Sequence, residues 1–132
     1  MFDKILFQFA GASLPPQYYR SYTIEINQKK ANIRVYNYST DLLSKDFEIF
    51  EEEWRNLQSF SLETLEKQGS KIEERATGTT LDTIILLKDD KEMYNFCFDS
   101  LSKVNEATEK LKATILSLIK PSVEEIINST RQ

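Results

Sequence analysis

Residues 18–38, YYRSYTIEINQKKANIRVYNY, contain two stretches in which apolar and polar side chains alternate. The apolar members of each stretch share one face: they are Tyr22, Ile24 and Ile26 in the first, and Ile33 and Val35 in the second. Alternation with a period of two is typical of a β-strand that buries one face. We therefore predict a β-hairpin here, and a fold built on antiparallel sheet.

The two stretches also predict their own register. A turn centred on Gln28 and Lys29 places Ile24 opposite Ile33, whereas a slip of one residue would move the apolar set to the other face. The opposite face of the hairpin then carries three cross-strand pairs, which are Thr23 with Arg34, Ser21 with Tyr36, and Tyr19 with Tyr38. This second face is polar and aromatic, and it suits water or a partner.

We predict that this second face binds another protein through Tyr19, Arg34, Tyr36 and Tyr38, because Tyr and Arg are concentrated among the residues that dominate protein–protein binding. Two other interpretations stay open. The side chains could serve packing within the sheet, or the rings could stack on single-stranded nucleic acid. The net charge of −4, from 17 basic and 21 acidic residues, disfavours nucleic acid and anionic membrane as partners.

The remaining strands extend this plan. Ile5, Phe7 and Phe9 alternate as a first strand, and Phe47 and Ile49 mark a short strand after a loop over residues 39–44. We expect a further strand over residues 71–75. Residues 81–88 and 93–99 predict a second hairpin around a four-residue turn, DDKE at 89–92.

Three segments predict helices. The first opens with the acidic run at 51–53, which suits the positive end of a helix dipole, and extends to Gln68 with a break near 59–61. The second carries an apolar stripe from Val104 to Ile119, and Ser102 or Asn105 is its expected N-cap. The third begins with a capping box at Ser122 and Glu125. We therefore expect one α+β domain over residues 1–132, an antiparallel sheet of hairpins packed against two to three amphipathic helices.

The second hairpin is apolar on both sides. The four-residue turn pairs Leu87 with Tyr94, Ile85 with Phe96, and Thr83 with Phe98. Its reverse side then carries four more apolar residues, which are Ile84, Leu86, Met93 and Cys97. Because monomers seldom expose a large apolar patch, we expect a cover there. The final helix, a second copy in a homodimer, or a protein partner could supply it.

Several chemistries are disfavoured by composition. Histidine is absent and Cys97 is the one cysteine, so tetrahedral zinc sites with nitrogen and sulfur ligands, and nucleophiles activated by histidine, have no residues to use. Cys97 lies between Phe96 and Phe98, where we expect a buried structural thiol. The acidic residues 46–53 lack the spacing of a calcium loop, and three glycines leave little room for a phosphate loop. We expect no catalytic residue, metal or cofactor.

The compartment is also suggested by composition. A single cysteine favours a reducing environment, and the apolar stretch from Ile5 to Phe9 is too short for an export signal. No run approaches the roughly 20 apolar residues of a membrane span. We therefore expect a cytoplasmic protein.

A further indication comes from the order of short segments: Phe9-Ala10-Gly11 near the start, a helix from Glu51 after a short strand, and Leu81-Asp82 ahead of a hairpin and a closing helix. In this order the chain resembles the emfourin type of small bacterial metalloprotease inhibitors, whose two opening glycines correspond to Ala10-Gly11 here. The resemblance implies a small β-rich bacterial protein that acts by binding another protein.

The first functional hypothesis is therefore a non-catalytic inhibitor, immunity-like or adaptor protein. The alternative is a small-molecule-binding domain or a histidine-free enzyme, with a pocket between sheet and helices that uses Tyr and carboxylate groups. A structural homodimer is a third hypothesis.

Overall fold

A computed structural model describes residues 2–11, 19–38, 40–68, 80–99, 106–119 and 122–130 of the chain. These residues form a six-stranded sheet and three helices, which confirms the predicted α+β class. The elements are β1 (Lys4–Ala10), β2 (Ser21–Asn27), β3 (Lys30–Asn37), β4 (Thr40–Glu48), α1 (Glu51–Gln68), β5 (Leu81–Lys88), β6 (Lys91–Asp99), α2 (Glu106–Ser117) and α3 (Val123–Ser129).

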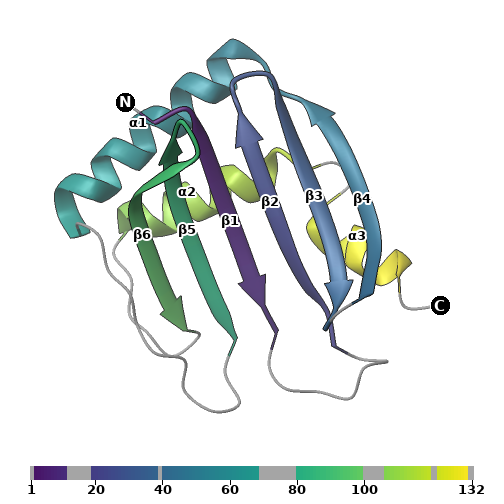
Figure 1. The fold of residues 1–132 in the computed structure, drawn as a ribbon. Helices are drawn as coiled ribbons and strands as arrows, with labels where there is room; N and C mark the ends of the chain where they lie inside the picture. The colour runs from purple at the N-terminus through teal and green to yellow at the C-terminus, as the bar shows by residue number, and fades with distance from the viewer. Residues whose placement is uncertain are drawn as a thin grey trace.

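The strands are ordered β4-β3-β2-β1-β5-β6, and all five pairings are antiparallel. The first four strands form a meander, and the β5–β6 hairpin joins the free side of β1. All three helices lie on one face of the sheet (Figure 1). The layout therefore leaves one face of the sheet packed on helices and one face without a described helix.

The core lies between the sheet and the helices. Phe7, at the centre of β1, pairs with Ile24 on β2 and Ile84 on β5, and all three side chains are fully buried. One cluster also includes Trp54 and Leu57 of α1, Phe96 of β6, Leu111 and Ile115 of α2, and Val123 and Ile126 of α3. This confirms the expectation that the apolar stripes of the helices share a core with the sheet.

The early hairpin has the predicted register. Ile24 pairs with Ile33, and Tyr22 pairs with Val35. The side chain of Asn27 stabilises the turn, because its Oδ1 atom accepts hydrogen bonds from the backbone amides of Lys29 and Lys30 at 2.8 and 2.9 Å. Asn favours this local bonding at turns, so the polar stretch between the strands forms a short loop.

The late hairpin differs from the predicted register. Asp89 and Asp90 both have positive φ, 50° and 62°, and they form a two-residue turn that pairs Lys88 with Lys91. A bulge at Met93 then shifts the pairing, so that Ile84 lies opposite Phe96 and Leu86 lies opposite Tyr94. Asp tolerates the left-handed region better than most residues, which makes the tighter turn accessible.

The set of residues predicted for the reverse side is consequently wrong, whereas the expected cover over Ile84 and Leu86 is supplied by the chain itself. Ile84 and Leu86 are not on the reverse side: they are fully buried against the helices. The final helix packs on the same face, since Val123 and Ile126 belong to the common core. Its predicted cap is confirmed, because the Ser122 Oγ atom accepts a hydrogen bond from the Glu125 amide at 3.2 Å.

Two other element boundaries in the structure also differ from the predicted ones. The segment predicted as a loop over 39–44 belongs to β4 from Thr40 onward, because pairing with β3 satisfies its backbone. Helix α1 continues through 59–61, where Ser61 is fully buried. The strand expected over 71–75 and the expected caps Ser102 and Asn105 lie outside the described residues.

Candidate functional site

The candidate site is the face of the sheet opposite the helices, across β1 to β4 (Figure 1). Pairing between neighbouring strands places Gln8, Thr23, Arg34 and Ser44 side by side across this face. These side chains offer amide, hydroxyl and guanidinium groups for hydrogen bonding. The face therefore has many donors and acceptors, but one cation in this row.

A shallow depression of about 250 Å³ lies within this face, lined by Leu6, Gln8, Thr23, Glu25, Asn32 and Arg34. The amide nitrogen of Asn32 donates to Asp46 Oδ1 at 2.8 Å and to Ser44 Oγ at 3.1 Å, which fixes its orientation. Contacts between β3 and β4 thus hold one of the lining side chains in place.

Arg34 and Tyr36 form the first of two pairs at one end of this face. The Arg34 guanidinium carbon lies 5.6 Å from the centroid of the Tyr36 ring, a cation–π distance. Arg34 Nε is 3.8 Å from Asp41 Oδ1, and both side chains are largely exposed. An exposed ion pair at that distance contributes little to stability, so the guanidinium can form other contacts.

Tyr19 and Tyr38 form the second pair. Their rings stack with centroids 4.0 Å apart, and the Tyr38 residue is 52% exposed. The structure also pairs Ser21 with Tyr36. All four residues predicted to bind a partner therefore lie at the same end of the β2–β3 hairpin.

Arg20, which lies between these residues in sequence, has a different role. It is 8% exposed, and its guanidinium donates to the Thr130 hydroxyl at 2.8 Å, the Thr130 carbonyl at 3.0 Å and the Tyr19 carbonyl at 2.7 Å. It thereby ties the start of β2 to the end of α3. Strand parity places Arg20 on the same face as Tyr22, which is a sequence signal for its burial.

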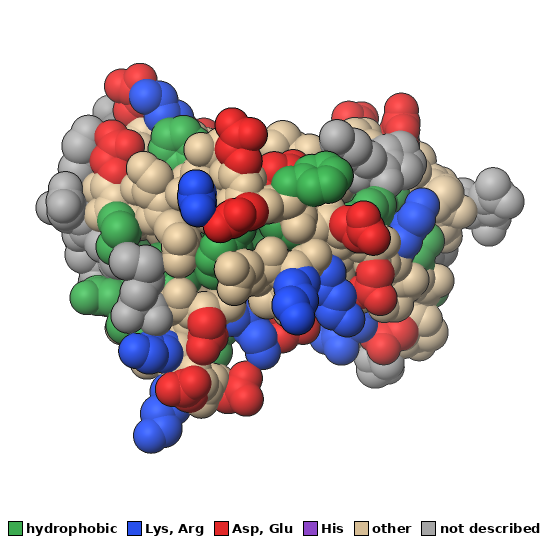
Figure 2. Space-filling model, turned by 90° about the horizontal axis from the view of Figure 1, so that it is seen from above, with side chains coloured by type: hydrophobic (Ala, Val, Ile, Leu, Met, Phe, Trp, Pro, Cys, Tyr) green, Lys and Arg blue, Asp and Glu red, His purple; other side chains and the backbone are tan. Residues whose placement is uncertain are grey.

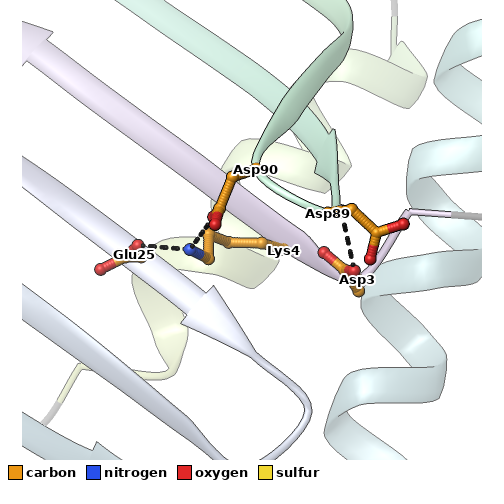
Figure 3. Close-up of polar contacts among 5 residues, drawn as sticks. All are labelled: Asp3, Lys4, Glu25, Asp89 and Asp90. Carbon is orange, nitrogen blue, oxygen red and sulfur yellow. Dashed lines mark hydrogen bonds and ion pairs between the residues drawn. The ribbon is translucent and has the colours of Figure 1, made fainter.

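A polar cluster at the other end of the sheet connects the β5–β6 turn to β1 and β2 (Figure 3). Lys4 Nζ lies 3.1 Å from both Asp90 Oδ1 and Glu25 Oε1. Hydrogen bonds to Asp90 and Glu25 raise the pKa of Lys4. The Asp89 amide donates to Asp3 Oδ2 at 3.1 Å. Acidic and basic side chains are interspersed among the described residues at this end of the molecule (Figure 2).

The acidic run at 51–53 and Cys97, which the sequence also offered as candidates, contact neighbouring residues of the fold. Glu51 pairs with Arg55 at 2.7 Å, and Glu53 Oε1 accepts a hydrogen bond from the Phe50 amide at 3.0 Å; the acidic run thus stabilises the start of α1, as predicted. Cys97 is buried beside Thr83, whose hydroxyl is 3.5 Å from the sulfur. Within the described ranges, no group of three or more Cys, Asp or Glu side chains is arranged to hold a metal ion.

Among the helices that the structure describes, none is both long and apolar enough to cross a membrane. The chain matches no protein-family model, and a search of curated proteins finds none with significant similarity.

Proposed function

We propose that this protein is a small non-catalytic module that binds another protein, as an inhibitor, immunity-like or adaptor protein. The binding surface is the face of its sheet opposite the helices. The observation that carries the proposal is the pair of contacts at one end of this face, Arg34 on Tyr36 and Tyr19 on Tyr38. We place its activity in the bacterial cytoplasm, in line with the single cysteine.

The geometry of the two pairs favours binding for two reasons. Stacking restricts the rings of Tyr19 and Tyr38 before a partner arrives, so less side-chain freedom is lost on association. In addition, the weak contact of Arg34 with Asp41 can be exchanged for a carboxylate of the partner. The matching partner surface therefore offers an acidic group next to an apolar or aromatic side chain.

Capture from bacterial lysate with matched baits tests this proposal. The baits are the wild type, Arg34→Glu, Tyr38→Ala, and a control, Phe50→Ser, which removes a highly exposed side chain beyond the far end of β4. We expect the wild type and the control to retain the same protein, and the two face variants to lose it. A partner retained equally by all four baits would place the interface elsewhere.

A direct contact measurement complements the capture. A photoreactive phenylalanine analogue replacing Tyr36 should cross-link to the captured partner, because Tyr36 lies on the proposed interface. The same analogue at position 50 serves as the control. Cross-linking from position 50 alone would contradict the proposal.

A further inference from the structure

A second concave surface lies on the helix side of the sheet, between the ends of β1 and β2 and the helices α2 and α3. This groove has a volume of about 420 Å³, within the range of roughly 300 to 1,000 Å³ for small-molecule sites. Its described lining is mainly apolar and aromatic, with three polar residues: Phe9, Tyr22, Leu116, Val123 and Ile127, together with Arg20, Glu124 and Asn128.

Tyr22 supplies the groove with a hydroxyl that has no hydrogen-bond partner among the described residues. The residue is 6% exposed, and its ring stacks on Phe9 with centroids 5.0 Å apart. Within the described chain, its hydroxyl forms no hydrogen bond with another residue. Buried tyrosine hydroxyls usually have a hydrogen-bond partner, so this one is available to a molecule in the groove.

The protonation state of Tyr22 makes it a donor. Burial, and secondarily the charge of Asp82, raise the pKa of Tyr22 far above its ordinary value. Asp82 lies on the other side of Phe9 from Tyr22 in the sheet, and its Oδ2 atom accepts a hydrogen bond from Lys112 at 2.6 Å. The phenol therefore stays neutral and keeps its proton at physiological pH.

The charges around the groove favour a neutral ligand. Glu124, an exposed residue of the lining, disfavours an anion, whereas the charge of Asp82 is paired with Lys112. The guanidinium of Arg20 already donates to the oxygens of Tyr19 and Thr130. An ionised ligand would also lose hydration against mainly apolar walls.

We propose that this groove binds a small uncharged molecule that has an apolar body and a carbonyl-type oxygen, and that the Tyr22 hydroxyl donates a hydrogen bond to that oxygen. The apolar body would occupy the space between Phe9, Leu116 and Ile127. This site lies on the opposite side of the sheet from the proposed protein-binding face and does not depend on it.

NMR titration of isotope-labelled protein tests the proposal with acetophenone and ethylbenzene, two probes of similar shape that differ by the carbonyl oxygen. We expect acetophenone to bind more tightly and to shift the amide signals of Phe9, Tyr22 and Val123, with little change at Arg34. In Tyr22→Phe, acetophenone should bind about two- to tenfold more weakly, as expected for the loss of one neutral hydrogen bond, while ethylbenzene binding stays the same. Tyr36→Phe, which loses a hydroxyl on the opposite face, should leave both affinities unchanged.

Three outcomes would overturn the proposal: no shifts up to the solubility limit of acetophenone, equal affinities of the two probes for the wild type, or shifts centred outside the groove. A loss of ethylbenzene affinity in Tyr22→Phe as large as the loss for acetophenone would also overturn the role of the hydroxyl. The comparison of the two probes on the wild type is decisive even if the variant is unstable.

Discussion

The ring of Tyr19 stacks on the ring of Tyr38, with centroids 4.0 Å apart and planes inclined by 11°. The two residues lie just outside β2 and β3, beyond the pair formed by Ser21 and Tyr36. The stack therefore extends the contact between these strands past their last backbone pair. Because Tyr38 has a φ of 44°, its backbone is in a region that non-glycine residues seldom occupy, which indicates that surrounding contacts hold it there.

We predict that this stack stabilises the fold by about 0.5 to 1.5 kcal/mol, a typical coupling for aromatic pairs. A double-mutant cycle of Tyr19→Ala, Tyr38→Ala and the combined variant measures this coupling from urea unfolding. A coupling energy near zero would mean that the stacked geometry does not stabilise the folded state.

The packing of α1 gives a second prediction. Trp54 is 5% exposed and meets Phe2 edge to face, with centroids 6.0 Å apart. Trp54→Ala should lower the free energy of unfolding by about 3 to 5 kcal/mol, because it leaves a cavity in the core. Unfolding in urea should be followed by circular dichroism, because Trp54 is the one tryptophan and its replacement removes the tryptophan fluorescence signal.

The matched control for Trp54 is its neighbour Arg55, which is exposed and pairs with Glu51 within one helix turn. Arg55→Ala should change stability by less than about 0.5 kcal/mol. Equal effects of the two substitutions would contradict the burial of Trp54.

The two hairpins show how much of this fold could be predicted from sequence. In β2 and β3 one face is apolar and the other polar, so only registers of the observed parity bury Ile24 and Ile33 together. In β5 the run Thr-Ile-Ile-Leu-Leu at 83–87 is apolar on both faces, so burial does not distinguish the possible registers. The choice depends on the turn at Asp89 and Asp90 and on the bulge at Met93, for which alternation carries no signal.

The contacts in and around the candidate site also differ in whether the sequence could predict them. The pairs of Tyr19 with Tyr38 and of Arg34 with Tyr36 are local to one hairpin, and strand parity predicts that they share a face. The contact of Arg20 with Thr130 joins residues 110 positions apart, and Lys4 meets Asp90 over 86 positions. The first contact depends on the placement of α3 and the second on the pairing of β1 with β5, neither of which local patterns specify. The groove behind the sheet likewise requires the observed placement of α3.

The β5–β6 turn gives a third prediction. Asp90 has a φ of 62°, where a residue with a Cβ atom is strained and glycine is not. Asp90→Gly and Asp90→Ala both remove the ion pair with Lys4, so the difference between them isolates the backbone effect. We expect the glycine variant to be more stable by about 1 kcal/mol, after the extra freedom of glycine in the unfolded chain is included. Thermal unfolding of the two variants measures this difference, and equal stabilities would contradict a strained turn.

The buried phenol of Tyr22 gives the last prediction, which concerns alkaline pH. Its pKa is raised in the folded state above the ordinary value of 10.0, mainly by burial and then by the charge of Asp82. Above that pH the unfolded chain releases the phenol proton while the folded protein retains it. The unfolded state then binds fewer protons, so the free energy of unfolding falls as pH rises, by up to about 1.4 kcal/mol per pH unit for this group.

Tyr22→Phe removes this contribution and keeps the ring that stacks on Phe9. Near neutral pH the variant should be as stable as the wild type or slightly more stable, because the lost hydroxyl has no hydrogen-bond partner among the described residues. Between pH 10 and 11 its stability should fall less steeply than that of the wild type, by about 1 kcal/mol. Urea unfolding at a series of pH values separates these cases, and identical alkaline slopes for the wild type and Tyr22→Phe would show that Tyr22 ionises as readily in the folded protein as in the unfolded chain.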